Sequence, residues 1–590
     1  MAKSDIDTLS EYYEYELSHL RSAGSEFACK FPKIARRLDL SGSESSDPHV
    51  ERLIESFAFL TGKLQKQIDD QFPATASALL DVLCQPLMLP TPSCVIVNFD
   101  IDIPRASKSP GFLIPRNTQL HTTSNSGEVC SFSTAHDLQL WPIEITKVAA
   151  VQKEHIPSYY ARSTFYLKIS VKYNGSAGSQ TPEKLRFYIN ANALLRGKIF
   201  SSIFMSEENV LFHKNEQFKF IPPISAIGLE DNESLFPYPT NVHKGFRLLH
   251  EYFSFGEKFL GFDVHISKSV DINGESTIYI PMQYDVSMQL SVKNFSISSV
   301  PAVNLFRKIS EPLRLEHKQV EYCLVSDFRR YRNHEIYNIE KIIAVDAEKN
   351  DEIVVPEFFS CDHGIIPFKE KIFWTARRKK SYIANALGDD IHISFIDMDF
   401  NPHFPADKVF YAHTLCTNRH IAEQIPASGT LKTEISTPTK NIFCVERPTS
   451  QKTSIKTGEI LWKFVSALSL NSISFNSDGI KKIKEIVGIF ADISISSLRG
   501  EIDAMIDVKC KTKTKRVCNQ TWQGFAVGSS IEITFDDSIS NFGIPLSLVI
   551  SKFLTSYTSI NTFTEVIVKS TTKNGILKKW EQHFGIQNYL

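Results

Sequence analysis

The sequence Gly245-Phe-Arg-Leu-Leu-His-Glu-Tyr-Phe-Ser-Phe-Gly-Glu-Lys-Phe-Leu-Gly-Phe-Asp263 interleaves aromatic and leucine residues with charged ones. The apolar side chains favour burial, whereas an isolated charge removed from water costs on the order of several kcal/mol unless it is paired. We therefore expect Phe255 and Phe259 to be buried, and Glu251 and Glu257 to pair with arginine or lysine.

The spacing within this stretch predicts its local structure. Five apolar residues follow the helical spacings four, three, four and three: Leu248, Tyr252, Phe255, Phe259 and Phe262. Gly256 interrupts the pattern, since glycine costs about 1 kcal/mol inside a helix. Phe262, Val264 and Ile266 then alternate as in a strand. We predict a helix that ends near Phe253, a turn at Gly256 and a strand. An ordinary packed helix and strand would explain the stretch without any further role.

The rest of the chain predicts an α+β fold, with an N-terminal helical region followed by several β-rich, sandwich- or barrel-like domains with interspersed helices. Helical periodicity covers residues 5–90, with Asp47 as a helix cap and Pro48 as the first helical residue. From Cys94 the period changes to two, which predicts a half-buried strand. Residues 427–439 read as a linker. The predicted domains are an N-terminal helical domain (1–92), a β-rich domain that contains the central motif 245–263 (93–300), a mixed α/β middle domain (301–425) and a C-terminal α+β domain (440–590).

Composition excludes several classes of protein. The 590 residues include 65 Lys plus Arg and 66 Asp plus Glu, so no bulk charge attracts nucleic acid or an anionic membrane. The ten cysteines form no Cys-x-x-Cys pair, which favours free thiols in a reducing compartment. No run of eighteen apolar residues predicts membrane insertion, and the polar N-terminus lacks the core of a signal peptide. We expect a cytoplasmic protein.

The sequence carries no strong catalytic or metal-binding motif. It contains no phosphate-binding loop, dinucleotide fingerprint, nucleophile elbow or His-Glu-x-x-His pair. His413, Cys416 and His420 would face one way on a helix, with His403 nearby, but closely spaced ligand pairs are absent. We therefore predict no catalytic residue, no cofactor and no metal. A β-rich carbohydrate-active enzyme with paired carboxylates in an aromatic cleft is the alternative.

Lysine alternates with other residues near the C-terminus, at Lys509, Lys511, Lys513 and Lys515. On a strand these lysines would form one basic face, and lysines commonly protect an exposed sheet edge from mispairing. We predict a solvated edge strand, with a partner's acidic surface as the functional alternative.

The central motif resembles that of the TssF (ImpG/VasA) family, whose pattern is close to Leu-Leu-x-Glu-Tyr-Phe-x-Phe-Pro-Glu-Lys-Phe. Residues 248–259 match it, with Gly256 in place of the proline. Further boxes of the family are matched in order along the chain, including Asn304-Leu305-Phe306, Cys416-Thr417-Asn418-Arg419 and Ser559-Ile560-Asn561. The residues that the resemblance marks as family-motif or interface candidates are Tyr12, Tyr13, Leu17, Phe27, Leu53, Phe57, Leu248, Glu251, Tyr252, Phe255, Glu257, Lys258, Phe259, Asn304, Arg419, Trp462 and Asn561.

The resemblance implies a structural subunit of the type VI secretion baseplate, related to wedge proteins of contractile phage tails. Two copies of the chain would contact each other and clasp one TssG, and TssK and TssE would complete a wedge around the VgrG spike. The wedges would support assembly of the Hcp tube and its contractile sheath, with TssA and sheath proteins as further partners. TssK would connect the assembly to the inner-membrane complex. No contact with nucleic acid is implied.

The N-terminal helices carry more apolar surface than they can cover alone. Their apolar residues include Phe27, Ile34, Leu53, Phe57, Leu60 and Leu64. Exposed apolar patches larger than a few hundred Å² usually mark interaction sites. We expect these helices to bind TssG, and the chain to purify poorly without it.

Overall fold

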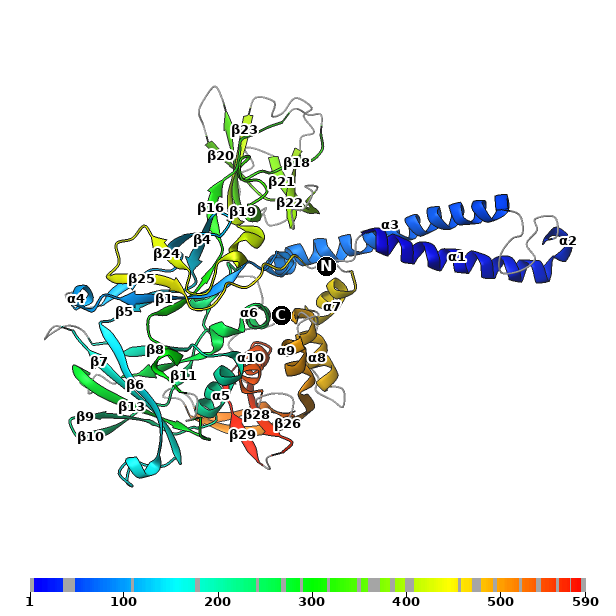
Figure 1. Ribbon diagram of the computed structural model, residues 1–590. Coiled ribbons are helices and arrows are strands. Elements are labelled where there is room, and N and C mark those ends of the chain that lie inside the picture. Colours follow the sequence, from blue (N-terminus) through cyan, green and yellow to red (C-terminus); the bar gives the residue numbers. More distant parts are fainter. Residues whose placement is uncertain are drawn as a thin grey trace. The chain divides into compact units, whose positions relative to one another are not determined.

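The computed structural model describes residues 5–584 apart from 36–47, 108–110, 176–180, 240–243, 267–271, 287–289, 316–318, 347–351, 359–371, 382–387, 398–407, 455–457, 469–478, 492–495, 519–522, 537–542, 559–561 and 573–574. Two compact units are present. The first comprises Met1–Asp81 with Ile455–Ser469, and the second comprises Val82–Ser454 with Leu470–Leu590 (Figure 1). These units do not test the four sequence-based domains, which remain a prediction.

The first unit is helical, as predicted. It contains α1 (Asp5–Lys30), α2 (Pro32–Ala35), most of α3 (Pro48–Met88) and α7 (Gly458–Leu468). Helix α3 begins at Pro48 as predicted, whereas its predicted cap Asp47 lies outside the described residues. A Cβ atom at Gly62 would lie 3.1 Å from the backbone of Tyr12 and Tyr13, so the glycine lets α3 approach α1 closely. An ion pair between Arg21 and Glu51 also joins the two helices.

A closed six-stranded barrel forms part of the second unit. Its strands, in spatial order, are β1 (Cys94–Ile101), β15 (Ser299–Val303), β4 (Val129–Thr134), β3 (Gln119–Thr123), β24 (Thr430–Thr433) and β25 (Thr439–Cys444). The linker predicted at 427–439 is therefore wrong, because β24 and the start of β25 close the barrel there. Strand β1 is almost fully buried rather than half-buried, since Val97 and Phe99 enter the barrel core while Ile96 packs into a neighbouring core cluster.

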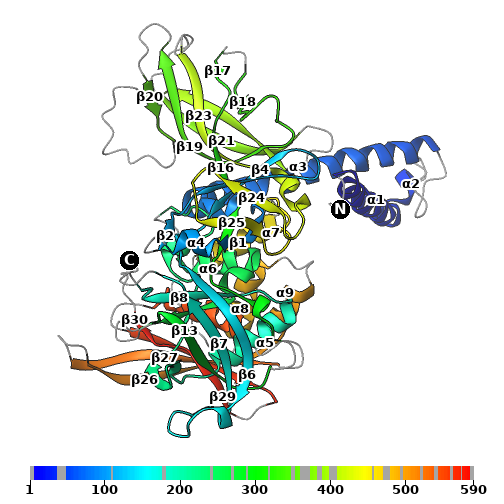
Figure 2. The ribbon, with the colours of Figure 1, turned by 60° about the vertical axis from the view of Figure 1, so that its left-hand side comes forward.

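Two further sheets of the second unit hold the central part of the chain. The first has the order β10 (Gln217–Ile221), β9 (Val210–Lys214), β13 (Gly274–Met282), β7 (Phe165–Tyr173) and β6 (Ile143–Gln152). The second has the order β11 (Ser225–Ala226), β12 (Gly261–His265), β8 (Lys184–Ile189) and β14 (Phe295–Ser296). Helix α5 (Ala193–Phe204) follows β8 along the chain. The ribbon shows these strands below the barrel (Figures 1 and 2).

Two facing sheets share one hydrophobic core between residues 306 and 417. One contains β16 (Phe306–Ile309), β23 (Lys408–Thr417), β19 (Glu335–Asp346) and β20 (Glu352–Val355), with β17 (Leu313–Arg314) beside β23. The other contains β18 (Tyr322–Cys323), β22 (Asp389–Asp397) and β21 (Ile372–Lys380). Trp374 of β21 and Ile342 of β19 both belong to this core.

The C-terminal part is a sheet covered by helices. Its order is β26 (Met505–Cys518), β27 (Gln523–Phe535), β28 (Thr562–Ser570) and β29 (Ile576–Lys579), with β30 (His583–Phe584) beside β28. Helix α10 (Ile544–Thr555) connects the parallel strands β27 and β28, as crossover helices do. Helices α8 (Gly479–Phe490) and α9 (Ser496–Asp503) precede β26. The helices predicted around 463–491 and 544–557 are thus confirmed.

The fold is α+β, as predicted. In the described part of the chain, no helix is both long and apolar enough to cross a membrane. The described cysteines are free thiols, as predicted: Cys94, Cys130, Cys323, Cys416, Cys444 and Cys510.

Candidate functional site at the central motif

The central motif folds as its spacing predicts. Helix α6 (Lys244–Ser254) ends one residue beyond the predicted position, and a short 3-10 helix, η3 (Gly256–Phe259), begins at Gly256. Strand β12 then pairs with β8. Gly261 is needed at this junction, because a Cβ atom there would lie 2.5 Å from the carbonyl oxygen of Phe187.

A buried ion pair joins the two helices of the motif. The Lys258 ammonium group donates to a carboxylate oxygen of Glu251, and these residues are 1% and 0% exposed. The second Glu251 oxygen accepts from the backbone N–H of Leu235 at 3.0 Å, and Arg247 lies 4.0 Å away. Burial lowers the pKa of Lys258, although the adjacent Glu251 partly offsets this shift. Pairing of this kind is what allows charges to stay in an apolar interior.

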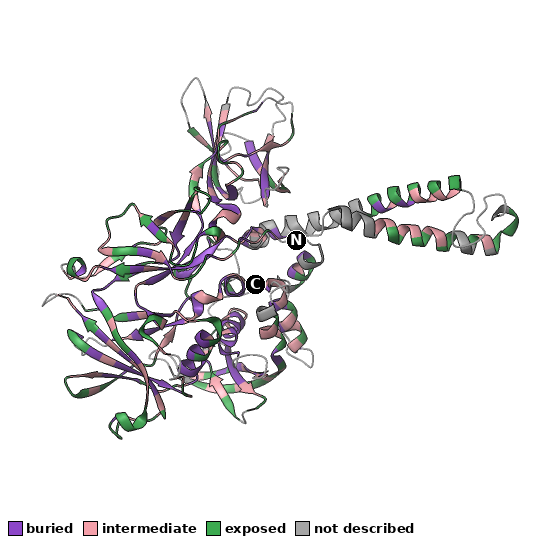
Figure 3. Ribbon diagram, viewed as in Figure 1, coloured by how far each residue is buried: buried purple, intermediate pink, exposed green. Residues whose placement is uncertain are grey.

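Phe255 and Phe259 are buried, as predicted, and the rings of the motif pack in several directions. Phe259 is fully buried, and Phe255 enters a core cluster with Phe236 and Tyr337. Phe246 contacts Phe553 of α10, with ring centroids 5.6 Å apart. Helix α6 is thereby fixed to the C-terminal sheet through α10. Buried residues dominate this region in Figure 3.

Two polar contacts extend from the outer turns of α6. The Tyr252 hydroxyl donates to Glu501 of α9 at 2.9 Å, and burial raises the pKa of both groups. His250 lies 2.9 Å from the Tyr238 hydroxyl. Burial lowers the pKa of His250 to about 4, with a further contribution from the positive charge of Lys452.

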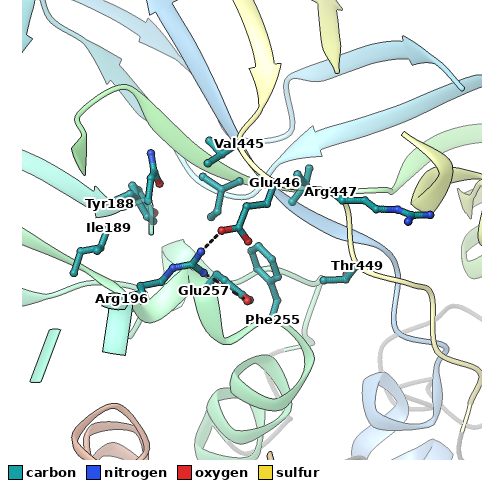
Figure 4. Close-up of a pocket in the computed structure, with 12 residues that line it drawn as sticks. Tyr188, Ile189, Arg196, Phe255, Glu257, Val445, Glu446, Arg447 and Thr449 are labelled. Atoms are coloured by element: carbon teal, nitrogen blue, oxygen red, sulfur yellow. Dashed lines mark hydrogen bonds and ion pairs between the residues drawn. The ribbon is translucent and has the colours of Figure 1, made fainter. Parts of the chain in front are cut away.

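Glu257 borders a cavity of about 140 Å³ that is lined by residues of the barrel, β8 and η3. Arg196 of α5 lies beside it, pairs with Glu446 and approaches Glu257 at 3.6 Å (Figure 4). Arg196 also donates to the carbonyl oxygen of Ala191 at 2.7 Å. The predicted pairing of Glu257 is therefore confirmed, and the two carboxylates are joined by one guanidinium group.

Strand β12 contributes a second buried charge, Asp263. Arg186 of β8 binds it through two parallel hydrogen bonds of 2.8 and 2.9 Å, and Lys184 lies 2.8 Å away. Burial alone would raise the pKa of Asp263, but the hydrogen bonds and charges of Arg186 and Lys184 outweigh burial and lower it. Arg186 also pairs with Glu233, so that four charged side chains are held together.

Asn304 and Arg419, two candidates from separate family boxes, belong to one buried region. Asn304 donates to the side-chain oxygen of Asn418 at 2.8 Å and accepts from its backbone N–H at 2.7 Å. The next residue, Arg419, begins η6 (Arg419–Gln424) with a positive φ of 49°. Its side chain donates to Asp390 at 3.2 Å and to the carbonyl oxygen of His334 at 3.1 Å. This region connects the barrel to the paired sheets of residues 306–417.

The helix considered for His413, Cys416 and His420 is not present. His413 and Cys416 lie on strand β23, where residues three apart point to opposite faces. His420 lies in η6 and His403 lies outside the described residues. Among the described residues no group of three or more His, Cys, Asp or Glu side chains is placed to hold a metal ion.

The remaining candidates lie in the first unit or outside the described part. Tyr12, Tyr13, Leu17 and Phe27 are on α1, and Trp462 is on α7 with its side chain 42% exposed. Asn561 is outside the described residues. Four residues of α3 form an exposed apolar stripe: Leu53 (70%), Phe57 (61%), Leu60 (57%) and Leu64 (58%). Their helical spacing places them on one side, whereas Ala58 and Gly62 are buried.

The family model described as "Type VI secretion system, TssF" matches residues 6–587. This chain belongs to the TssF family. It is 25% identical over 611 residues to type VI secretion system component TssF1 of Pseudomonas aeruginosa, which covers 97% of this chain and 98% of that protein.

Solved structures share the fold of this TssF family member. A chain of the TssK-TssF-TssG baseplate subcomplex of a type VI secretion system matches with a TM-score of 0.73 and 17% identity, over 92% of this chain and 99% of its own length. A chain of the baseplate complex from the type VI secretion system matches with a TM-score of 0.58 and 17% identity, over 98% and 99%.

Sequence reasoning missed the partners of the candidate residues. Arg186, Arg196 and Asp390 do not differ in sequence from surface charges. Asp263 offered one signal in the sequence, because this charge lies between Phe262 and Val264 in a predicted strand. In the structure every residue of that strand but the last is buried.

Proposed function

We propose that this chain is a structural subunit of a type VI secretion baseplate and not an enzyme. The family match over nearly the whole chain carries this proposal. The likeness to a chain of a TssK-TssF-TssG subcomplex supports it at the level of the fold. The assembly would lie in the bacterial cytoplasm and dock at the inner-membrane complex through its partners.

The charged residues favour a mechanical role over acid–base catalysis. Glu257 and Glu446 border a cavity, as an enzyme's carboxylates would, yet both approach Arg196. Asp389 and Asp390 at the start of β22 are buried, and they accept hydrogen bonds from Ser454 and Tyr331 respectively. Such pairings hold segments together, and they give no support to the carbohydrate-active enzyme.

Within this role, the apolar stripe of α3 is the proposed contact with TssG. Leu53, Phe57, Leu60 and Leu64 are each more than half exposed in the chain by itself. Apolar side chains of this size at helical spacing fit a partner's hydrophobic groove. We further propose that two copies of the chain bind one TssG and contact each other, and that TssK, TssE, VgrG, Hcp, TssA and the sheath proteins are the remaining partners.

Co-expression with TssG, followed by mass measurement of the intact complex, tests the proposal. We expect a soluble complex with two copies of this chain per TssG, and poor recovery of the chain alone. A monodisperse monomer that does not bind TssG would overturn the proposed role.

A further inference from the structure

The exposed face of the C-terminal sheet is densely basic. Strand register places six lysines on this side, opposite to the face that packs against α10. We call them the lysine face: Lys509, Lys511, Lys513 and Lys515 of β26, Lys569 of β28 and Lys579 of β29. Their side chains are 35–67% exposed, so the ammonium groups are accessible.

Three carboxylates pair with the six lysines, so they neutralise only part of the positive charge. Lys509 lies 3.0 Å from Asp507 on its own strand, and two glutamates pair with the other five lysines. Glu565 is fully buried and lies 3.1 Å from both Lys513 and Lys515 and 2.8 Å from Lys579. Glu532 lies 3.3 Å from Lys511 and 2.8 Å from Lys569. Five lysines thus share two carboxylates, and the face keeps a net positive charge although the whole chain has a net charge of −1.

The basic side chains lie along the edge strand of the sheet, which helices α8 and α9 also contact. Strand β26 has 14 residues, more than any other described strand, and among the described strands it pairs with β27 alone. Alternate residues on a strand are about 6.8 Å apart, so the β26 lysines form a regular row. An added strand with carboxylates at alternate positions would place one opposite each lysine, and opposite charges across strands are stabilising.

We propose that the β26 edge is a docking site for an extended acidic segment of a partner protein, which adds as a strand beside β26. Main-chain hydrogen bonds along the edge would supply affinity, and the lysine row would supply specificity. A lysine row also opposes pairing with neutral or basic strands. A polypeptide fits this edge better than a nucleic acid, since only a polypeptide offers backbone groups that continue the sheet.

Fluorescence anisotropy with a labelled eight-residue peptide of alternating Glu and Thr tests this proposal. The protein is the full chain, in complex with TssG if that is needed for solubility. We expect binding that weakens as salt rises. We also expect at least tenfold weaker binding for the Gln-Thr peptide and for a peptide with four Glu followed by four Thr. Of the two versions that carry N-methyl groups on alternate residues, one in each phase, we expect only one to bind at least tenfold more weakly, because the N–H groups of alternate residues point to opposite edges of a strand and only one set faces β26.

Charge-reversal variants locate the site. Lys509→Glu combined with Lys511→Glu changes the two most exposed lysines of the row and should weaken binding at least tenfold. The matched control is Lys432→Glu with Lys440→Glu, two exposed lysines on β24 and β25, which should leave binding unchanged.

Four results would overturn the proposal: no binding, equal binding of the alternating and block peptides, unchanged binding to the Lys509/Lys511 variant, or equal binding of an oligothymidylate of the same charge. The last result would show a general polyanion surface. None of these results depends on a baseplate role, so the two proposals fail separately.

Discussion

The central motif and helix α3 are both rich in apolar residues, but the motif buries its large side chains together with charges, whereas α3 leaves large apolar side chains exposed. In the motif, Glu251 and Lys258 are buried as a pair and Phe259 is enclosed. On α3, Leu53 and Phe57 remain exposed, with no charge between them in the stripe. Both segments carry family-motif residues, so membership of a motif does not by itself indicate whether a residue serves the fold or an interface.

The two segments differ in how many of their side chains find contacts within the chain. The motif contacts α5, α9 and α10 as well as β8, so its rings and charges find partners within the chain. Helix α3 approaches α1 through small residues such as Gly62, which leaves its larger apolar side chains on another side. Substitutions in the motif should therefore affect folding, and substitutions in the stripe should affect assembly.

Removing the negative charge of Glu251 should have the largest effect on stability. Glu251→Gln keeps the acceptor for the Leu235 N–H but leaves the Lys258 ammonium without its counter-charge. Loss of one partner of a buried pair costs about 3–5 kcal/mol. Urea denaturation followed by tryptophan fluorescence measures this change.

Two controls make this result specific. Glu257→Gln removes a partly exposed charge whose partner Arg196 keeps Glu446, so it should cost at most about 1 kcal/mol. The double variant Glu251→Gln with Lys258→Met removes both charges and should recover most of the lost stability. If the double variant is less stable than Glu251→Gln, the Glu251–Lys258 charge pair is not the cause.

Truncation of Phe259 should have the next largest effect. Phe259→Ala empties a site that is closed on all sides and should cost about 3 kcal/mol in the same denaturation experiment. Phe525→Ala is the matched control, because this ring is 74% exposed and its loss should change stability by no more than about 0.5 kcal/mol. Equal costs for the two variants would show that Phe259 is not a core residue.

The burial of His250 predicts a pH dependence. Its pKa is lowered from 6.5 to about 4 in the folded chain, so between these values the unfolded chain binds the proton more tightly. Stability should therefore fall as pH drops from 6.5 to 4, with up to about 1.4 kcal/mol per pH unit from this histidine. His250→Gln should reduce the slope by that amount, whereas His155→Gln, at an exposed position on the short 3-10 helix Lys153–His155, should not. An unchanged slope in His250→Gln would contradict the prediction.

Local structure in the motif could be predicted because local chemistry determines it. Gly256 marks the break between α6 and η3, and alternation marks β12. The need for cationic partners could also be predicted, but their identity could not. Arg196 is some sixty residues from Glu257 in sequence, and the fold alone brings them together.

Pairing between strands that are distant in sequence also explains why the linker predicted at residues 427–439 is wrong. Residues 427–439 contain Ser428, Gly429 and Pro438, a composition shared by linkers and tight turns. Ser428 adopts a positive φ of 63° in a turn that leads into β24, and β24 pairs with the distant strand β3. Nothing within the segment distinguishes these alternatives, because the partner strand decides between them.

The smallest effect on stability, and the largest on assembly, is expected from the α3 stripe. Leu53→Ser with Phe57→Ser removes side chains that are already in solvent, so the free energy of unfolding should change by about 0.5 kcal/mol or less per site. If the stripe is the contact with TssG, the same variant should lose that partner when the two proteins are co-expressed and the mass of the intact complex is measured.

Ala58→Leu is the matched control, since it adds a larger side chain at a buried position of the same helix and should destabilise the chain itself. A Leu53/Phe57 variant that unfolds would place the stripe inside the fold, and one that still binds TssG fully would move the interface elsewhere. Loss of binding with stability retained would distinguish two kinds of motif residue: those that stabilise the fold and those that bind another subunit.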